Sequence, residues 1–89
     1  MQLSDRDREI IVEEARRAGI RSVYVFGSTL SATGVPRDID IAVKGVPRGA
    51  FFRFYAALSR RLSLPLDVVD LGQRNAVTRL IARDAVRIA

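Results

Sequence analysis

The sequence contains no cysteine, no histidine and no tryptophan among its 89 residues. Disulfides, thiol nucleophiles, Ser-His-Asp triads and the usual zinc sites are therefore excluded, because each needs cysteine or histidine. Any metal ion must be held by oxygen ligands, which suit Mg²⁺, Mn²⁺ or Ca²⁺. No apolar run approaches the roughly 18 residues of a membrane span, and the charged start is not that of a signal peptide. We therefore expect a cytoplasmic protein with no membrane partner.

Acidic residues are also few, with 10 Asp and Glu against 15 Lys and Arg, which gives a formal net charge of +5. The acids from Ile20 onward are Asp38, Asp40, Asp67, Asp70 and Asp84. Four of these five fall in two candidate strands, and a basic body with acids placed in this way suits a protein that handles a polyanion, such as a nucleoside triphosphate or a nucleic acid. An arginine-rich composition without functional meaning explains the net charge equally well.

The length and the apolar periodicity predict a single domain over residues 1–89 with an α/β (α+β) fold. A small mixed sheet of three to four strands should have helices packed on it, in the order α-β-α-β-α-β-α. The predicted elements are a helix Asp5–Ala18 between Ser4 and Gly19, a central strand Ser22–Phe26, a short helix from Ser28 to about Ala32, a loop Gly34–Arg37, a strand Asp38–Val43, a turn Gly45–Gly49, a helix from Phe51 to about Leu62, a strand Leu66–Leu71, and a last helix with Asn75 as N-cap that includes Val77, Leu80, Ile81 and Ile88.

Two aspartates interrupt an apolar run that is otherwise suited to burial. Because successive strand side chains point to opposite faces, Asp38 and Asp40 should share one face. Ile39, Ile41 and Val43 should share the other face. Strands are depleted in Asp, so two carboxylates here need a compensating partner, most often a metal ion. The pattern predicts an anionic site made by two carboxylates on one face of the strand, with apolar side chains on the other face.

A Gly-Ser pair, Gly27 and Ser28, ends the preceding apolar strand. Glycine permits close approach of the backbone, and the free N–H groups of a helix that begins at Ser28 would face an anion. Alone, such a pair is more often a simple turn. Its spacing to the two aspartates is what favours a functional role. A P-loop, a dinucleotide-binding fingerprint and an EF-hand beginning at Asp38 are all absent, because their required glycines, lysine or glutamate are missing.

A third carboxylate is expected from the strand Leu66–Leu71. Asp67 and Asp70 differ in parity, so only one of them can face the way Asp38 and Asp40 do. Asp67 is favoured because Asp70 stands next to Gly72, where an Asp at a strand end is common without any function.

These residues together resemble the nucleotidyltransferases of the DNA polymerase β superfamily, whose motif is an apolar residue, Gly-Ser, about ten residues, and Asp-x-Asp on a strand. The matching segments are Val25-Phe26-Gly27-Ser28 and Asp38-Ile39-Asp40-Ile41. The chain is most similar to the small members called minimal nucleotidyltransferases, in which a strand like Pro65–Leu71 supplies the third acid. The resemblance extends over about Val23–Leu71.

The resemblance implies a chemistry and a partner. Asp38 and Asp40 would bind two Mg²⁺ ions, or Mn²⁺, and Asp67 would join them at the catalytic metal. Gly27 and Ser28 would hold the triphosphate of ATP. The reaction implied is transfer of AMP to a protein hydroxyl, a tyrosine of a HEPN-domain toxin, with this chain as the antitoxin in a homo- or hetero-oligomer. Two metal ions can perform this chemistry without a histidine or a covalent intermediate.

The chain departs from the family pattern directly after Gly-Ser. Many relatives have an arginine at that position, where this chain has Thr29. Arg37, next to Asp38, is the expected substitute for the phosphate contact, with Lys44 as another candidate. Two alternatives remain open: a binding module that neutralises its partner by contact alone, and a basic nucleic-acid-binding protein.

Overall fold

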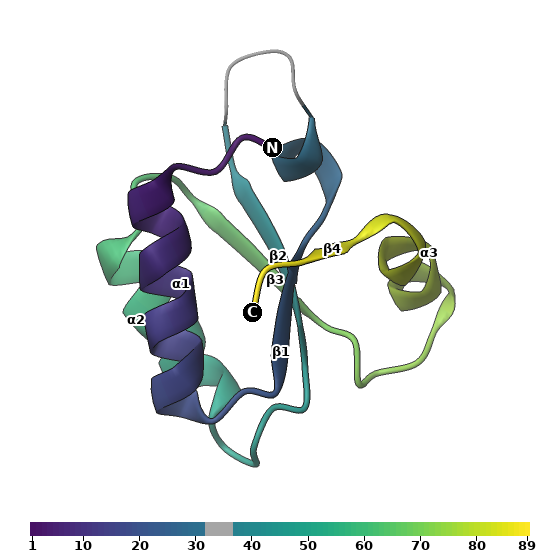
Figure 1. Cartoon of the computed structure of the whole chain (residues 1–89). Coiled ribbons are helices and arrows are strands. Elements are labelled where there is room, and N and C mark those ends of the chain that lie inside the picture. Colours follow the sequence, from purple (N-terminus) through teal and green to yellow (C-terminus); the bar gives the residue numbers. More distant parts are fainter. Residues whose placement is uncertain (32–36) are drawn as a thin grey trace.

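The computed structural model describes residues 1–31 and 37–89, which form a four-stranded mixed sheet with helices on both sides (Figure 1). The elements are α1 (Asp5–Ala18), β1 (Ser22–Val25), the 3₁₀ helix η1 (Gly27–Leu30), β2 (Ile39–Lys44), α2 (Phe51–Arg61), β3 (Leu66–Asp70), α3 (Ala76–Asp84) and β4 (Val86–Arg87). The strand order is β3-β2-β1-β4, so β1 is an inner strand as expected. The predicted α/β class with a small mixed sheet is confirmed.

The strand pairing brings three strand ends to one edge of the molecule. β1 runs antiparallel to β2 with Val25 opposite Ile41, so the end of β1 lies beside the start of β2. β2 runs parallel to β3 with Ile39 opposite Leu66, so β3 begins at the same edge. Parallel neighbours need a crossover, and α2 provides it. The turn that follows β1 therefore lies next to the first residues of both β2 and β3.

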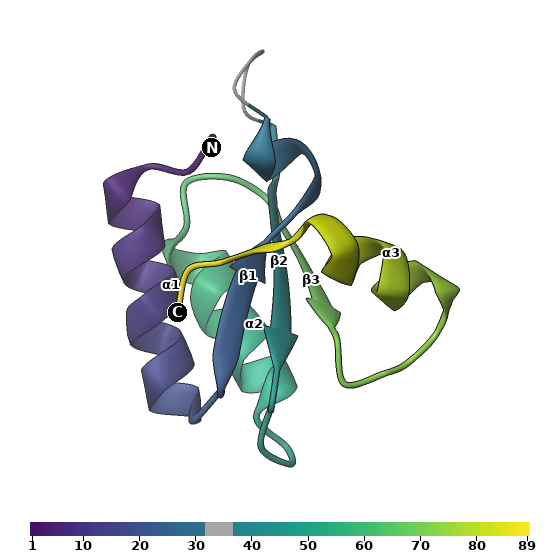
Figure 2. The same ribbon diagram turned by 45° about the vertical axis from the view of Figure 1, so that its right-hand side comes forward.

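Two helices cover one face of the sheet and the third lies on the other face. Figures 1 and 2 show α1 and α2 side by side on one side, with α3 on the opposite side. Within residues 1–31 and 37–89, no helix is long and apolar enough to cross a membrane. The two faces of the sheet are thus covered by different helices.

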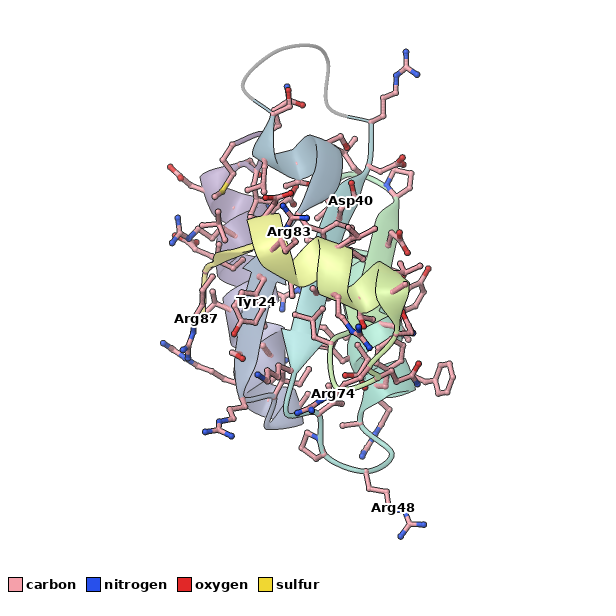
Figure 3. The ribbon with its side chains drawn as sticks, turned by 90° about the vertical axis from the view of Figure 1, so that its right-hand side faces the viewer. Tyr24, Asp40, Arg48, Arg74, Arg83 and Arg87 are labelled. Carbon is pink, nitrogen blue, oxygen red and sulfur yellow. The ribbon has the colours of Figure 1, made fainter. Side chains whose placement is uncertain are left out.

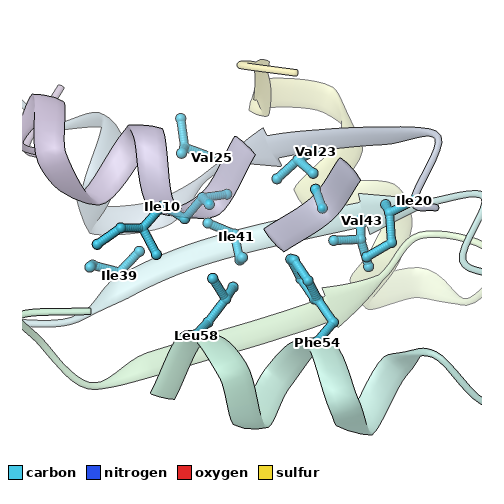
Figure 4. Close-up of a cluster of buried hydrophobic side chains, with 11 residues drawn as sticks. Ile10, Ile20, Val23, Val25, Ile39, Ile41, Val43, Phe54 and Leu58 are labelled. Atoms are coloured by element: carbon cyan, nitrogen blue, oxygen red, sulfur yellow. The ribbon is translucent and has the colours of Figure 1, made fainter. Parts of the chain in front are cut away.

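The hydrophobic core fills the space between the sheet and the α1–α2 layer (Figure 4). Ile39, Ile41 and Val43 of β2 are at most 1% exposed, which confirms the predicted apolar backing of the aspartate strand. From α2, Phe54 and Leu58 pack against them at helical spacing. Alternation along β2 thus fixes its orientation, because a shift by one residue would bury the aspartates and expose the isoleucines.

The first helix has the predicted caps, and a buried aspartate also links it by hydrogen bonds to a distant loop, which the sequence did not indicate. Ser4 Oγ accepts a hydrogen bond from the Asp7 N–H at 3.0 Å, and Gly19 ends the helix. The Asp7 side chain is buried and accepts hydrogen bonds from Ser63 N–H at 3.3 Å and Ser63 Oγ at 2.5 Å. These bonds fasten α1 to the loop between α2 and β3.

Three details of the sequence prediction need correction. The last helix ends at Asp84, and Ile88 lies beyond β4, where its N–H donates to Val23 O at 2.9 Å. The predicted element order therefore omitted β4. The helix after β1 is a 3₁₀ helix that begins at Gly27 and ends at Leu30. Its predicted end near Ala32 and the predicted loop residues 34–36 lie outside the described residues.

Truncating Phe54 should destabilise the fold strongly. Phe54 is 2% exposed, so Phe54→Ala should leave a cavity and lower the free energy of unfolding by about 3–5 kcal/mol. Phe52, which is 83% exposed on the same helix, is the matched control, and Phe52→Ala should change stability by less than about 0.5 kcal/mol. Urea denaturation of both variants measures the difference. Equal losses would contradict this assignment of the core.

Candidate active site

Asp40 and Asp67 are direct neighbours on paired strands. The register of β2 and β3 places Asp40 opposite Asp67, and side chains of paired residues in adjacent strands lie on the same face. This is the face away from the buried Ile39 and Ile41. Asp40 is half-buried and Asp67 is exposed. The strand pairing thus brings these two predicted site residues together.

The turn after β1 is bonded to Asp40 at three points. Ser28 Oγ donates to Asp40 Oδ2 at 3.1 Å. Phe26 N–H donates to Asp40 O at 3.1 Å, and Asp40 N–H donates to Thr29 Oγ1 at 2.8 Å. The predicted association of the Gly-Ser turn with the aspartate strand is therefore present as a set of specific hydrogen bonds.

Gly27 lies in this turn at a position where any side chain would cause strain. Its φ is +58°, a left-handed conformation that disfavours other residues. A Cβ at this position would lie 2.8 Å from Asp40 Oδ2, closer than real contacts allow. The absence of a side chain at Gly27 therefore leaves the Asp40 carboxylate in place and open to a ligand.

Asp38 lies one residue before β2 and is exposed. Three carboxylates, Asp38, Asp40 and Asp67, therefore stand at one edge of the sheet. Within residues 1–31 and 37–89, no three acidic, histidine or cysteine side chains lie close enough to form a metal-binding group. Carboxylates at close range repel each other, so convergence would require a cation between them. The donor set is entirely oxygen, which fits a hard divalent cation.

Asp70 occupies a different environment from Asp67. It pairs with Val43 near the far end of β2, and its Oδ1 accepts a hydrogen bond from Gly72 N–H at 2.8 Å. It lines a groove of about 720 Å³, whose other lining residues are Phe51, Phe52, Val68, Val69, Gln73, Asn75, Ala76, Val77 and Thr78. Asp70 thus has the role of a strand-end turn residue, and the geometry favours Asp67 as the third carboxylate.

The two basic residues that the sequence suggests for a phosphate contact lie at different distances from Asp40. Arg37 is exposed and precedes Asp38. Lys44 stands four residues along β2 from Asp40, about 13 Å away at 3.3 Å per residue, which argues against a shared ligand.

Sequence reasoning missed Arg83. β4 pairs with β1 with Val86 opposite Val25, so the last turn of α3 lies close to where η1 begins. Figure 3 shows Arg83 pointing from the end of α3 toward the edge that contains Asp40, with Arg48 at the opposite end of the molecule. Only the register of β4, a two-residue strand, reveals this proximity.

Comparison with known protein families and with curated proteins gives no match. Solved structures do match. A chain of a toxin–antitoxin complex with AMP-PNP superposes with a TM-score of 0.74 at 24% identity, over 92% of this chain and 72% of that one. A complex of a tri-AMPylated Shewanella oneidensis HEPN toxin with an MNT antitoxin gives 0.69 at 22% identity, over 93% and 69%.

A third match is a proposed minimal nucleotidyltransferase, with a TM-score of 0.69 at 26% identity, over 89% of this chain and 86% of that one. All three similarities extend over most of both chains, so they concern the whole arrangement of helices and sheet. The chain therefore has the fold of the minimal nucleotidyltransferases, which confirms the resemblance that its Gly-Ser and Asp-x-Asp motifs predict.

Proposed function

We propose that this chain is a metal-dependent nucleotidyltransferase that transfers AMP from ATP to a hydroxyl group of a HEPN-domain toxin and so acts as its antitoxin. The observation that carries the proposal is the pairing of Asp40 with Asp67 beside the Gly27–Ser28 turn. This arrangement puts two carboxylates and the Gly27–Ser28 turn at one edge, with an apolar layer behind them. Such a site can hold divalent cations and the triphosphate that they bind.

The residues present fit a pair of divalent cations. Asp38, Asp40 and Asp67 would hold them, because all three supply carboxylate oxygens at one sheet edge. When bound, such ions lower the pKa of an attacking hydroxyl and neutralise the phosphates. Ser28 orients the Asp40 carboxylate through its hydrogen bond to Oδ2. Gly27 leaves space beside the same oxygen for a phosphate to approach.

The proposed reaction is a single displacement at the α-phosphorus. The acceptor hydroxyl oxygen forms a bond to the α-phosphorus as the bond to the bridging oxygen of the β-phosphate breaks, and pyrophosphate leaves with that electron pair. Asp67 stands on β3, the edge strand, and is exposed, so an approaching hydroxyl can give it its proton. Arg83 at the end of α3 would balance charge on the triphosphate.

The structural neighbours support the nucleotide and the partner. One was solved with AMP-PNP, an analogue of ATP, and another contains an AMPylated HEPN toxin bound to an MNT antitoxin. Their identities to this chain are 24% and 22%, so the substrate and partner are carried over as parts of the proposal. The basic surface of the chain agrees with a polyanionic substrate.

Removing the strand carboxylates should abolish AMP transfer. Asp40→Asn and Asp67→Asn should each lower the rate at least about a hundredfold, since each removes a charged ligand of the cations. Asp70→Asn is the control, because asparagine can still accept from Gly72 N–H. The assay incubates each variant with a HEPN-domain protein from the same host, Mg²⁺ and labelled ATP. If the wild type and the variants all neutralise the toxin and none of them labels it, the enzyme proposal is wrong and the chain is a binding module that acts by contact alone.

Gly27→Ala should remove activity through the clash with Asp40 Oδ2. Gly49→Ala is a closely matched control, because Gly49 also has a positive φ, +78°, but nothing lies within 4 Å of its added Cβ. Both variants should lose about 1–2 kcal/mol of stability from the left-handed backbone. Only Gly27→Ala should lose AMP transfer. Thermal denaturation and the labelling assay together test this, and equal activities of the two variants would contradict the role of Gly27.

Arg83→Gln should weaken ATP binding about tenfold, as expected for the loss of one charge-assisted hydrogen bond. Arg48→Gln is the control, because Arg48 is exposed at the other end of the molecule (Figure 3). Calorimetric titration with Mg²⁺ and AMP-PNP measures both affinities. If the two variants lose affinity equally, net charge rather than a specific phosphate contact explains the effect.

A further inference from the structure

Regular pairing between β1 and β2 ends one residue short of Asp40, where a backbone hydrogen bond from Phe26 N–H to Asp40 O remains at 3.1 Å. The last paired residues are Val25 and Ile41, and beyond them the chain of β1 turns away into η1. On the other side of β2, Ile39 N–H donates to Pro65 O at 2.8 Å. The Asp40 N–H therefore points to the side from which β1 has departed, and it needs a replacement acceptor.

Thr29 supplies that acceptor from inside the protein. Its Oγ1 accepts the Asp40 N–H at 2.8 Å, and the residue is 1% exposed. Its carbonyl oxygen also accepts a hydrogen bond from Gln2 N–H at 2.6 Å, so it is held by the N-terminal segment as well. A residue this deeply buried cannot contact a phosphate directly. Its hydroxyl instead bonds the main chain of β2.

The Thr29 bond completes a short frame around Asp40. Phe26 N–H holds the Asp40 carbonyl, Thr29 holds the Asp40 N–H, and Ser28 bonds the carboxylate. With both main-chain groups fixed, the Cα–Cβ direction of Asp40 is set, and the Ser28 bond then selects the orientation of the carboxylate. Without the Thr29 acceptor, the Asp40 N–H would lose its partner, and one of the bonds that fix the direction of the Asp40 side chain would be absent.

We infer that Thr29 is a positioning residue that aims the Asp40 carboxylate at the bound cation through the Asp40 main chain. This role rests on the proposed function of Asp40 as a cation ligand. It gives a physical reason for threonine at the position where the resemblance leads one to expect an arginine. A β-branched hydroxyl residue fills the buried space and supplies the acceptor, which an arginine side chain cannot do.

Two substitutions separate the hydroxyl from the shape of the side chain. Thr29→Val keeps the shape and removes the acceptor, and Thr29→Ser keeps the acceptor. Thr29→Ala removes the acceptor without placing a methyl group against the N–H, so it serves where the valine variant does not fold. Thr78→Val is the matched control, because Thr78 is also buried and its Oγ1 accepts Asn75 N–H at 3.0 Å rather than an N–H of the aspartate strand.

The first measurement is amide hydrogen exchange by NMR, which does not depend on any activity. In the wild type, the Asp40 amide should be protected. In Thr29→Val, its exchange should be about tenfold faster, while Thr29→Ser and Thr78→Val leave it within about twofold of wild type. An Asp40 amide that exchanges equally fast in the wild type and Thr29→Val would overturn the inference.

The second measurement is Mn²⁺ affinity in the presence of AMP-PNP, followed by electron paramagnetic resonance. Thr29→Val should bind Mn²⁺ about tenfold more weakly, with Thr29→Ser restoring the affinity and Thr78→Val unchanged. Unchanged Mn²⁺ affinity in a folded Thr29→Val would overturn the positioning role while leaving the proposed function intact. No Mn²⁺ binding by the wild type would overturn the proposed function itself, and with it this role.

Discussion

The point at which β1 and β2 stop pairing determines the geometry of the whole site. Up to Val25 and Ile41, the two strands share regular antiparallel hydrogen bonds. Beyond this pair, β1 must turn sharply, which requires the left-handed conformation of Gly27. At Asp40, Phe26 N–H still bonds the carbonyl oxygen, whereas Thr29 Oγ1 accepts the N–H in place of a backbone carbonyl. The turn and the aspartate are therefore one structural unit, and neither can shift without breaking hydrogen bonds of the other.

The apolar face of β2 makes this unit rigid. Ile39 and Ile41 flank Asp40 in the sequence and are at most 1% exposed beneath α1 and α2. Because their packing fixes the strand, the alternate face can carry carboxylates that strands normally exclude. Asp40 and Asp67 stand at the strand beginnings on this second face, where Asp40 is half-buried and Asp67 is exposed. Burial of the isoleucines on one face of β2 thus stabilises the strand enough for its other face to carry charged aspartates.

Local patterns in the sequence were sufficient to predict most of the fold. Ser4 and Gly19 bound α1, and Asn75 caps α3, because capping depends on neighbouring residues alone. Parity allows only one of Asp67 and Asp70 to face the way Asp40 does, and the strand-end position of Asp70 beside Gly72 favours Asp67, which the register places opposite Asp40. β4 could not be predicted, because two residues have no periodicity of their own. Ile88 continued the apolar spacing of the helix, although it follows a strand that only pairing with β1 creates.

The functional residues that sequence reasoning missed share one cause. The proposed role of Thr29 depends on a hydrogen bond across eleven residues, and the proposed role of Arg83 depends on the pairing of Val86 in β4 with Val25 in β1. Neither relation leaves a local pattern. Together they explain how the site can work without an arginine after Gly-Ser: the turn uses that position to fix Asp40, and a helix 50 or so residues later in the chain supplies the positive charge. In this proposal, positioning of Asp40 and the positive charge come from two different elements, η1 and α3, and the pairing of the short strand β4 with β1 places them near the same edge.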